Sequence, residues 1–223
     1  MGAALRGGRL PPLRRAAVTA ALALAGCRFA PGPFDLDDPD ATRCTSSDDH
    51  VTCDFVTVPF HLALAKREVH LQHPTGTPPE AGWPTVVLFQ GSLVSAVHFW
   101  EGDADDAFGG LHQAELVRDL LDAGYAVITP EARLDGASFW QTNVYPTSLF
   151  WKGCEDDKLV KGLLAAIDAG ELGPIDPDAL FAGGISSGGY MTSRLAKAYP
   201  GRFRALAIQS ASWATCAGPV CVL

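Results

Sequence analysis

Short apolar runs alternate with segments of helical periodicity through most of the chain. Residues 85–89, 125–129 and 179–183 are apolar runs of the length that buried strands have. Residues 114–123 and 159–167 instead repeat their apolar positions about every 3.6 residues, as a helix with one buried face does. This alternation predicts a mostly parallel sheet with helices packed on its faces.

The two ends of the pattern differ from its middle. Residues 53–60 and 68–72 look like strands, and the first alternates apolar and polar side chains, which indicates an antiparallel pair at one edge of the sheet. Residues 204–210 form the last apolar run and predict a further strand. We therefore expect an α/β fold with a doubly wound, mostly parallel sheet that is antiparallel at its start.

Five residues between a predicted strand and a predicted helix carry the clearest chemical signal: Gly184, Ile185, Ser186, Ser187 and Gly188. In this G-x-S-x-G pattern the two glycines leave room for a sharp strand-to-helix turn that exposes the central serine. Such a turn is the nucleophile elbow of the α/β-hydrolases, so Ser186 is the candidate catalytic nucleophile. A nucleotide-binding loop is not expected, because the G-x-G-x-x-G register fails here and no Gly-Lys-Ser/Thr follows.

Acyl transfer also needs hydrogen-bond donors for the negative charge that develops on the substrate oxygen. The backbone N–H of Ser187 takes this role by its position at the N-terminus of the predicted helix. The second donor comes from the loop after the first central strand, residues 89–92, where we assign the backbone N–H of Ser92. Taken alone, Gly91-Ser92 is also compatible with an ordinary surface turn.

The general base and its carboxylate partner are not found where this fold places them, after the serine. The chain contains no Asp, Glu or His beyond Ser186. We therefore expect an N-terminal portion of a longer enzyme, truncated after the strand that follows the elbow helix, and by itself poorly folded and inactive. The alternative is an unusual arrangement in which His98 or His112 acts as the base.

The N-terminal stretch predicts export. Four arginines precede an apolar run at residues 16–25, which is too short to span a bilayer. The run ends in Leu24-Ala25-Gly26-Cys27, which resembles the bacterial lipoprotein box, so we expect removal of residues 1–26 and lipidation of Cys27 at the cell envelope. Ordinary signal cleavage followed by secretion is the alternative.

The rest of the chain divides by composition and charge. Residues 27–48 are rich in Pro, Gly and Asp and are expected to form a tether, and residues 49–223 the catalytic portion. Loss of residues 1–26 removes four arginines and no acidic residue, so the net charge moves from -8 to -12. A nucleic-acid partner is therefore not expected.

Export also changes how the cysteines are interpreted, because an oxidising compartment permits disulfides. Cys44 and Cys53 are close enough in sequence to close a small loop, and so are Cys216 and Cys221. Cys154 is left without a partner.

Three segments carry a family resemblance: residues 184–194, 199–203 and 207–212. With their GISSG box they resemble the extracellular polyhydroxyalkanoate depolymerases, above all the medium-chain-length group, over residues 85–223. The resemblance implies hydrolysis of aliphatic polyesters through an acyl-enzyme on Ser186, without a metal or organic cofactor. The family's Asp and His have no counterpart here, and the lipoprotein box departs from freely secreted relatives.

Aromatic residues gather in the two long loops that follow strands, where α/β sheets bind ligands. Trp100, Trp140 and Trp151 are the candidate substrate-binding residues, although the same rings would equally serve to pack the loops onto the core. The acidic residues of segment 101–106 do not predict a calcium site, since the EF-hand register breaks at Ala107.

Two other functions remain open. One is an esterase for plant-wall (feruloyl or acetyl) or other small acyl esters. The other is a surface lipoprotein that keeps a partial hydrolase fold without catalysis. The intact elbow favours an enzyme, and the missing Asp and His favour inactivity of this particular chain. The oligomeric state is not predicted.

Overall fold

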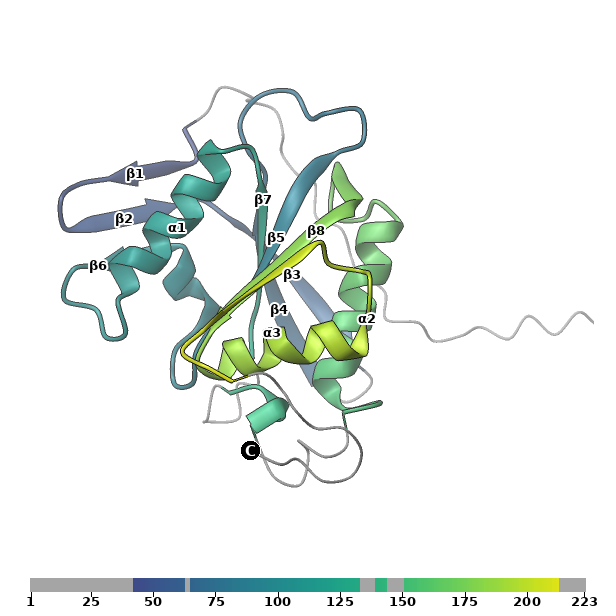
Figure 1. Cartoon of the computed structure of the whole chain (residues 1–223). Helices are drawn as coiled ribbons and strands as arrows, with labels where there is room; N and C mark the ends of the chain where they lie inside the picture. Colours follow the sequence, from purple (N-terminus) through teal and green to yellow (C-terminus); the bar gives the residue numbers. More distant parts are fainter. Residues whose placement is uncertain (1–41, 63–64, 133–138, 144–150, 213–223) are drawn as a thin grey trace, which may run out of the picture.

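The computed structural model describes residues 42–62, 65–132, 139–143 and 151–212. Its main sheet has six strands in the order β3-β4-β7-β5-β8-β9 (Figure 1). The strands are β3 (Val56–Leu62), β4 (Ala65–Gln72), β5 (Trp83–Phe89), β7 (Ala126–Pro130), β8 (Ile175–Ile185) and β9 (Ala205–Gln209). The pairs β3–β4 and β4–β7 are antiparallel, whereas β7, β5, β8 and β9 run parallel. This confirms the predicted sheet and its antiparallel start.

In the described part of the chain, three α-helices cover both faces of the sheet: α1 (Gly110–Asp122), α2 (Glu155–Asp168) and α3 (Ser187–Ala198). Successive side chains of a strand point to opposite faces. Accordingly, Val87 and Phe89 of β5 join the core that contains residues of α2 and α3, whereas Leu88 joins the core that contains residues of α1. The sheet is therefore doubly wound, as the sequence predicts.

A second, three-stranded sheet was not predicted. It contains β1 (Cys44–Ser46), β2 (His50–Cys53) and β6 (Glu101–Asp103), all antiparallel, and lies beside α1 (Figure 1). The predicted tether of residues 27–48 is therefore wrong at its C-terminal end, where β1 is already paired. The strands are short and mostly polar, so they carry no strand periodicity that sequence analysis detects.

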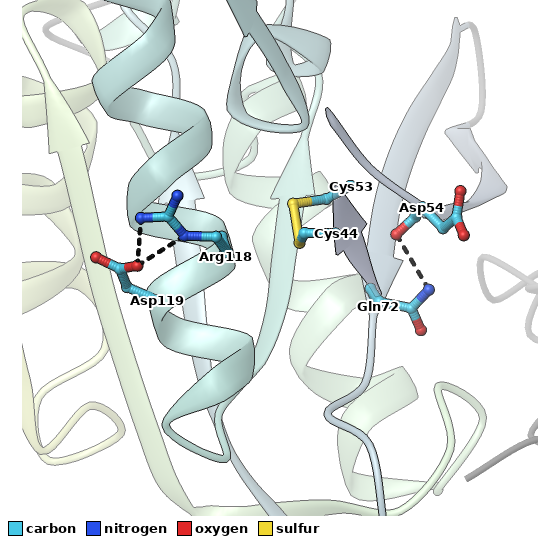
Figure 2. Close-up of a disulfide and its surroundings, with 6 residues drawn as sticks. All are labelled: Cys44, Cys53, Asp54, Gln72, Arg118 and Asp119. Carbon is cyan, nitrogen blue, oxygen red and sulfur yellow. Dashed lines mark hydrogen bonds and ion pairs between the residues drawn. A yellow bond between two sulfur atoms is a disulfide. The ribbon is translucent and has the colours of Figure 1, made fainter. Parts of the chain in front are cut away.

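The predicted disulfide between Cys44 and Cys53 is present and joins β1 to β2 (Figure 2). Next to it, the side-chain amide of Gln72 in β4 donates to the carbonyl oxygen of Asp54 at 3.0 Å, which connects this sheet to the main one. The other predicted modifications, at Cys27, Cys216 and Cys221, lie outside the described residues.

The helices begin earlier than their apolar periodicity indicates. Helix α2 starts at Glu155 because Cys154 caps it: the backbone N–H of Asp157 donates to the Cys154 thiol at 3.4 Å. Burial raises the pKa of that thiol, which keeps Cys154 in its unreactive form. None of the helices in the described residues combines the length and the apolar character needed to cross a bilayer.

Candidate active site

Ser186 occupies the turn between β8 and α3 in a strained backbone conformation. Its φ of 52° and ψ of -116° lie outside the regions that most L-residues adopt, which costs about 1–3 kcal/mol. Hydrogen bonds hold the turn: the N–H of Ser186 donates to the carbonyl oxygen of Gln209 at 2.9 Å, and the N–H of Tyr190 donates to the carbonyl oxygen of Ser186 at 3.1 Å. The side chain is exposed, as the hydroxyl of an elbow must be.

Glycines make this turn possible because neighbouring backbone approaches them too closely for a side chain. A Cβ on Gly188 would lie 1.9 Å from the carbonyl oxygen of Phe89, at the end of β5. One on Gly184 would lie 2.3 Å from the carbonyl oxygen of Gly188. The positions two before and two after Ser186 are therefore glycines because neither has room for a side chain, as the sequence predicts. Their small size lets the N-terminus of α3 pack directly against β5.

The loop after β5 lies against the elbow. A Cβ built on Gly91 would lie 3.8 Å from the Cβ of Ser186, which is an ordinary van der Waals contact. Ser92 follows at once, and its backbone N–H has no protein acceptor within the part of the chain that is described. Ser187 is the first residue of α3. The fold thus brings both predicted donor residues to the neighbourhood of Ser186, and their role remains a prediction.

A buried carboxylate that the sequence analysis missed fixes this loop. Glu131 directly follows β7 and is only 3% exposed. Its Oε1 accepts the backbone N–H of Ala96 at 2.9 Å and the hydroxyl proton of Ser95, at the start of the short helix η1 (Ala96–Phe99). A single acidic residue at the carboxyl end of a buried strand is the one signal that could have identified it.

Arg67 of β4 is hydrogen-bonded to the backbone of Glu131 and to helix α2. It is 2% exposed, and its guanidinium donates from Nη1 to the carbonyl oxygen of Glu131 at 3.0 Å and from Nη2 to Oδ1 of Asp156 at 2.9 Å. Asp156 belongs to α2 and is completely buried. Burial raises the pKa of the Asp156 carboxyl, while the charge of Arg67 opposes that rise.

The three candidate tryptophans do not form one surface. Trp100 and Trp140 are both 0% exposed. Trp100 packs in the core that contains residues of α1, and its indole N–H donates to the Thr129 hydroxyl at 2.6 Å. Trp140 packs edge-on against Phe89, with 5.1 Å between the two ring centroids. For these two residues the prediction of substrate contact is wrong, because their rings are enclosed by the protein. Trp151 is partly buried, so its contact with substrate stays a prediction.

Within the described residues, the two alternative bases, His98 and His112, are not hydrogen-bonded to Ser186, and their role stays a prediction. His112 lies on an exposed part of α1 and contacts Glu115 at 2.9 Å, while His98 lies in η1. A mostly apolar groove of about 400 Å³ passes His112, Gly184 and Ile185, but Ser186 does not line it. In the same part of the chain, no group of three His, Cys, Asp or Glu residues is arranged to hold a metal ion.

Comparison with known proteins adds one close relative and a structural likeness. The poly(3-hydroxyoctanoate) depolymerase of Pseudomonas fluorescens is 41% identical over 201 residues, which are 90% of this chain and 68% of the relative. No protein-family model matches. The solved structure of S-formylglutathione hydrolase from Staphylococcus aureus is similar with a TM-score of 0.50 and 15% identity, over 71% of this chain and 59% of that one. At that identity the likeness concerns the fold alone, which is that of α/β-hydrolases.

The buried ion pair makes a prediction about stability. Replacing Arg67 by Met leaves the carboxylate of Asp156 buried without its cation, which should lower the free energy of unfolding by about 3–5 kcal/mol near neutral pH. Urea denaturation measures this. The double variant Arg67→Met/Asp156→Leu carries neither charge and should recover a large part of the loss.

The direction in which the stability loss of Arg67→Met changes with pH provides the control for this prediction. A raised pKa means that native Asp156 binds its proton more tightly than the unfolded chain, whose carboxyl has a pKa near 3.8. Stability contributed by such a group falls as the pH rises above that value. Without Arg67 the pKa rises further, so the deficit of Arg67→Met should shrink as the pH is lowered toward about 4. A deficit independent of pH, or a double variant no more stable than the single one, would contradict this account.

Proposed function

The chain belongs to the polyhydroxyalkanoate depolymerase family of α/β-hydrolases, and we propose that the protein hydrolyses aliphatic polyesters with Ser186 as its nucleophile. The observation that carries the proposal is the strained, exposed position of Ser186 between two glycines that admit no side chain. The substrate class comes from the relative, whose name specifies a polymer of 3-hydroxyoctanoate. No organic cofactor or metal takes part in the proposed reaction.

The chemistry proceeds through two acyl transfers. The Oγ of Ser186 attacks the carbonyl carbon of an ester unit as a general base removes its proton, and the carbonyl oxygen becomes an oxyanion. The N–H groups of Ser187 and Ser92 stabilise that charge, each by about 3 kcal/mol if they act like other oxyanion donors. Collapse of the intermediate breaks the ester C–O bond, and the base returns its proton to the departing oxygen, so the neighbouring unit leaves as an alcohol and an acyl-Ser186 remains. Water, deprotonated by the same base, then attacks the acyl carbon and releases the carboxylic acid and the Ser186 hydroxyl.

Among the described residues, no general base is hydrogen-bonded to Ser186. All six histidines precede the elbow in the sequence. Hydrolysis through Ser186 depends on such a base.

We further propose that the protein is exported and anchored by a lipid on Cys27. Support comes from the arginine-rich start, the short apolar run and the Leu24-Ala25-Gly26-Cys27 box. The disulfide between Cys44 and Cys53 is consistent with an oxidising compartment. A lipid anchor would hold the enzyme at the cell envelope, where it meets polymer outside the cell.

Replacing Ser186 by Ala should abolish hydrolysis. The clearing of a poly(3-hydroxyoctanoate) suspension and the release of p-nitrophenol from p-nitrophenyl octanoate should both fall by a factor of about 10⁴ or more. The matched control is Ser47→Ala, since among the described residues the Ser47 hydroxyl bonds to Asp49 and His50 within an exposed turn. It should retain the activity of the natural protein.

The same assays separate the alternatives. Polymer clearing that persists in Ser186→Ala would show that the wrong nucleophile is named. Turnover of short acyl esters without polymer clearing would favour the small-ester esterase. A natural protein that is folded but turns over neither substrate would favour the non-catalytic lipoprotein.

The anchor predicts where the protein is found. In the native bacterium the protein should fractionate with membranes and incorporate labelled fatty acid, and Cys27→Ala should lose the label and leave the membrane fraction. Cys154→Ser is the matched control, because that thiol caps a helix within the fold. Labelling that survives Cys27→Ala, or a natural protein found only in the medium, would refute the assignment.

A further inference from the structure

One buried residue is hydrogen-bonded both to the loop that carries Ser92 and to the start of α3, where Ser187 lies. The indole N–H of Trp140 donates to the carbonyl oxygen of Gln90 at 3.0 Å. Its backbone N–H donates to the Oγ of Ser187 at 3.1 Å. Gln90 lies two residues before Ser92, and Ser187 is the other donor residue. A single side chain and its own backbone thus connect the loop after β5 to the first turn of α3.

The ring of Trp140 has little freedom to move. It is completely buried and packs edge-on against Phe89, whose carbonyl oxygen is the one that approaches Gly188. The contacts of Trp140 therefore lie beside the close approach of Gly188 to the end of β5. In such a close-packed interior, a displaced ring moves its neighbours with it.

The segment that holds Trp140 is anchored on its other side. The backbone N–H of Gln141 donates to Oδ2 of Asp156 at 2.6 Å, and the backbone N–H of Asp156 donates to Oε1 of Gln141 at 3.1 Å. Asp156 in turn pairs with Arg67. Trp140 therefore lies between the elbow and the buried ion pair of Arg67 and Asp156. This ion pair restrains the segment from which Trp140 makes its two hydrogen bonds.

Separation of the two donors matters for catalysis. Oxyanion donors stabilise the transition state only when both point at the developing charge, at about 2.7–3.1 Å from it. In the proposed reaction one donor belongs to α3 and the other to a loop that is not continuous with it in sequence. Their spacing therefore depends on contacts between the two elements, and Trp140 makes hydrogen bonds to both.

We propose that Trp140 is a positioning residue that sets the separation of the Ser92 and Ser187 N–H groups and thereby stabilises the oxyanion. This inference rests on the proposed function. It assigns Trp140 a role that acts through other residues, without contact with the substrate. Packing alone would make Trp140 equivalent to Trp100, which is equally buried but bonds to Thr129 in the other core.

The test compares two substitutions that each delete one buried indole N–H. Trp140→Phe should lower kcat for p-nitrophenyl octanoate about three- to tenfold, the effect of one hydrogen bond, and leave KM within about twofold. Affinity for an alkylboronic acid, whose tetrahedral serine adduct mimics the intermediate, should fall by the same factor. Trp100→Phe should lower the melting temperature comparably and leave kcat and boronate affinity unchanged.

Two further measurements keep the inference testable. Ser187→Ala removes the hydroxyl acceptor and keeps the backbone N–H, so its kcat should also fall, and combination with Trp140→Phe should cost less than the two changes added together. Amide hydrogen exchange should accelerate at residues 90–93 in Trp140→Phe and remain unchanged there in Trp100→Phe. This measurement needs no turnover.

The outcomes are separable from those of the proposed function. A Trp140→Phe protein that loses stability but keeps the kcat and boronate affinity of the natural protein would overturn the positioning role. So would unchanged exchange at residues 90–93. A natural protein without esterase activity would refute the proposed function instead, and the exchange data would still decide whether Trp140 holds the loop.

Discussion

The approach of the elbow helix to the end of β5 is the contact on which the site depends. At Gly188 the helix and the strand are so close that a methyl group would lie 1.9 Å from the Phe89 carbonyl oxygen. This proximity brings Ser186, at the N-terminus of α3, beside Gly91 in the loop that leaves β5. A larger residue at 188 would separate the two elements, and with them the nucleophile and the loop that carries Ser92. The glycine is thus a requirement of the chemistry as well as of the turn.

Buried polar groups of the sheet and of α2 stabilise the segments on either side of this contact. Arg67 in the antiparallel part of the sheet bonds to the backbone of Glu131 and to the side chain of Asp156. Glu131 fixes the loop after β5 through Ala96, while Asp156 fixes the segment of Trp140 through Gln141. Burying such charges is expensive, and an apolar replacement is often as stable. Their arrangement here supports a positional role, because they bond to the two segments that flank the elbow.

Local pattern along the chain predicts a large part of the fold, whereas the features that depend on long-range contact leave no such pattern. The sheet, its antiparallel edge, the three helices and the elbow follow from periodicity and from glycine spacing. The bond between Arg67 and Asp156 joins residues 89 positions apart, and no periodic signal marks a single buried charge. Trp140 was assigned to the substrate because an aromatic residue in a loop has the same pattern whether it lines a groove or packs beneath it. Residues Glu101–Asp103 pair as a strand, which the acidic composition of segment 101–106 does not predict.

The central claim is that the elbow presents Ser186 as an activated nucleophile. It is tested most directly by treating the natural protein with a fluorophosphonate and locating the adduct by peptide mass spectrometry. The account predicts one phosphonylated residue, Ser186, formed faster in the folded protein than after denaturation, because a serine hydroxyl outside an activated site reacts poorly. An adduct on another residue, or a folded and hydrolytically active protein that forms none at Ser186, would contradict it.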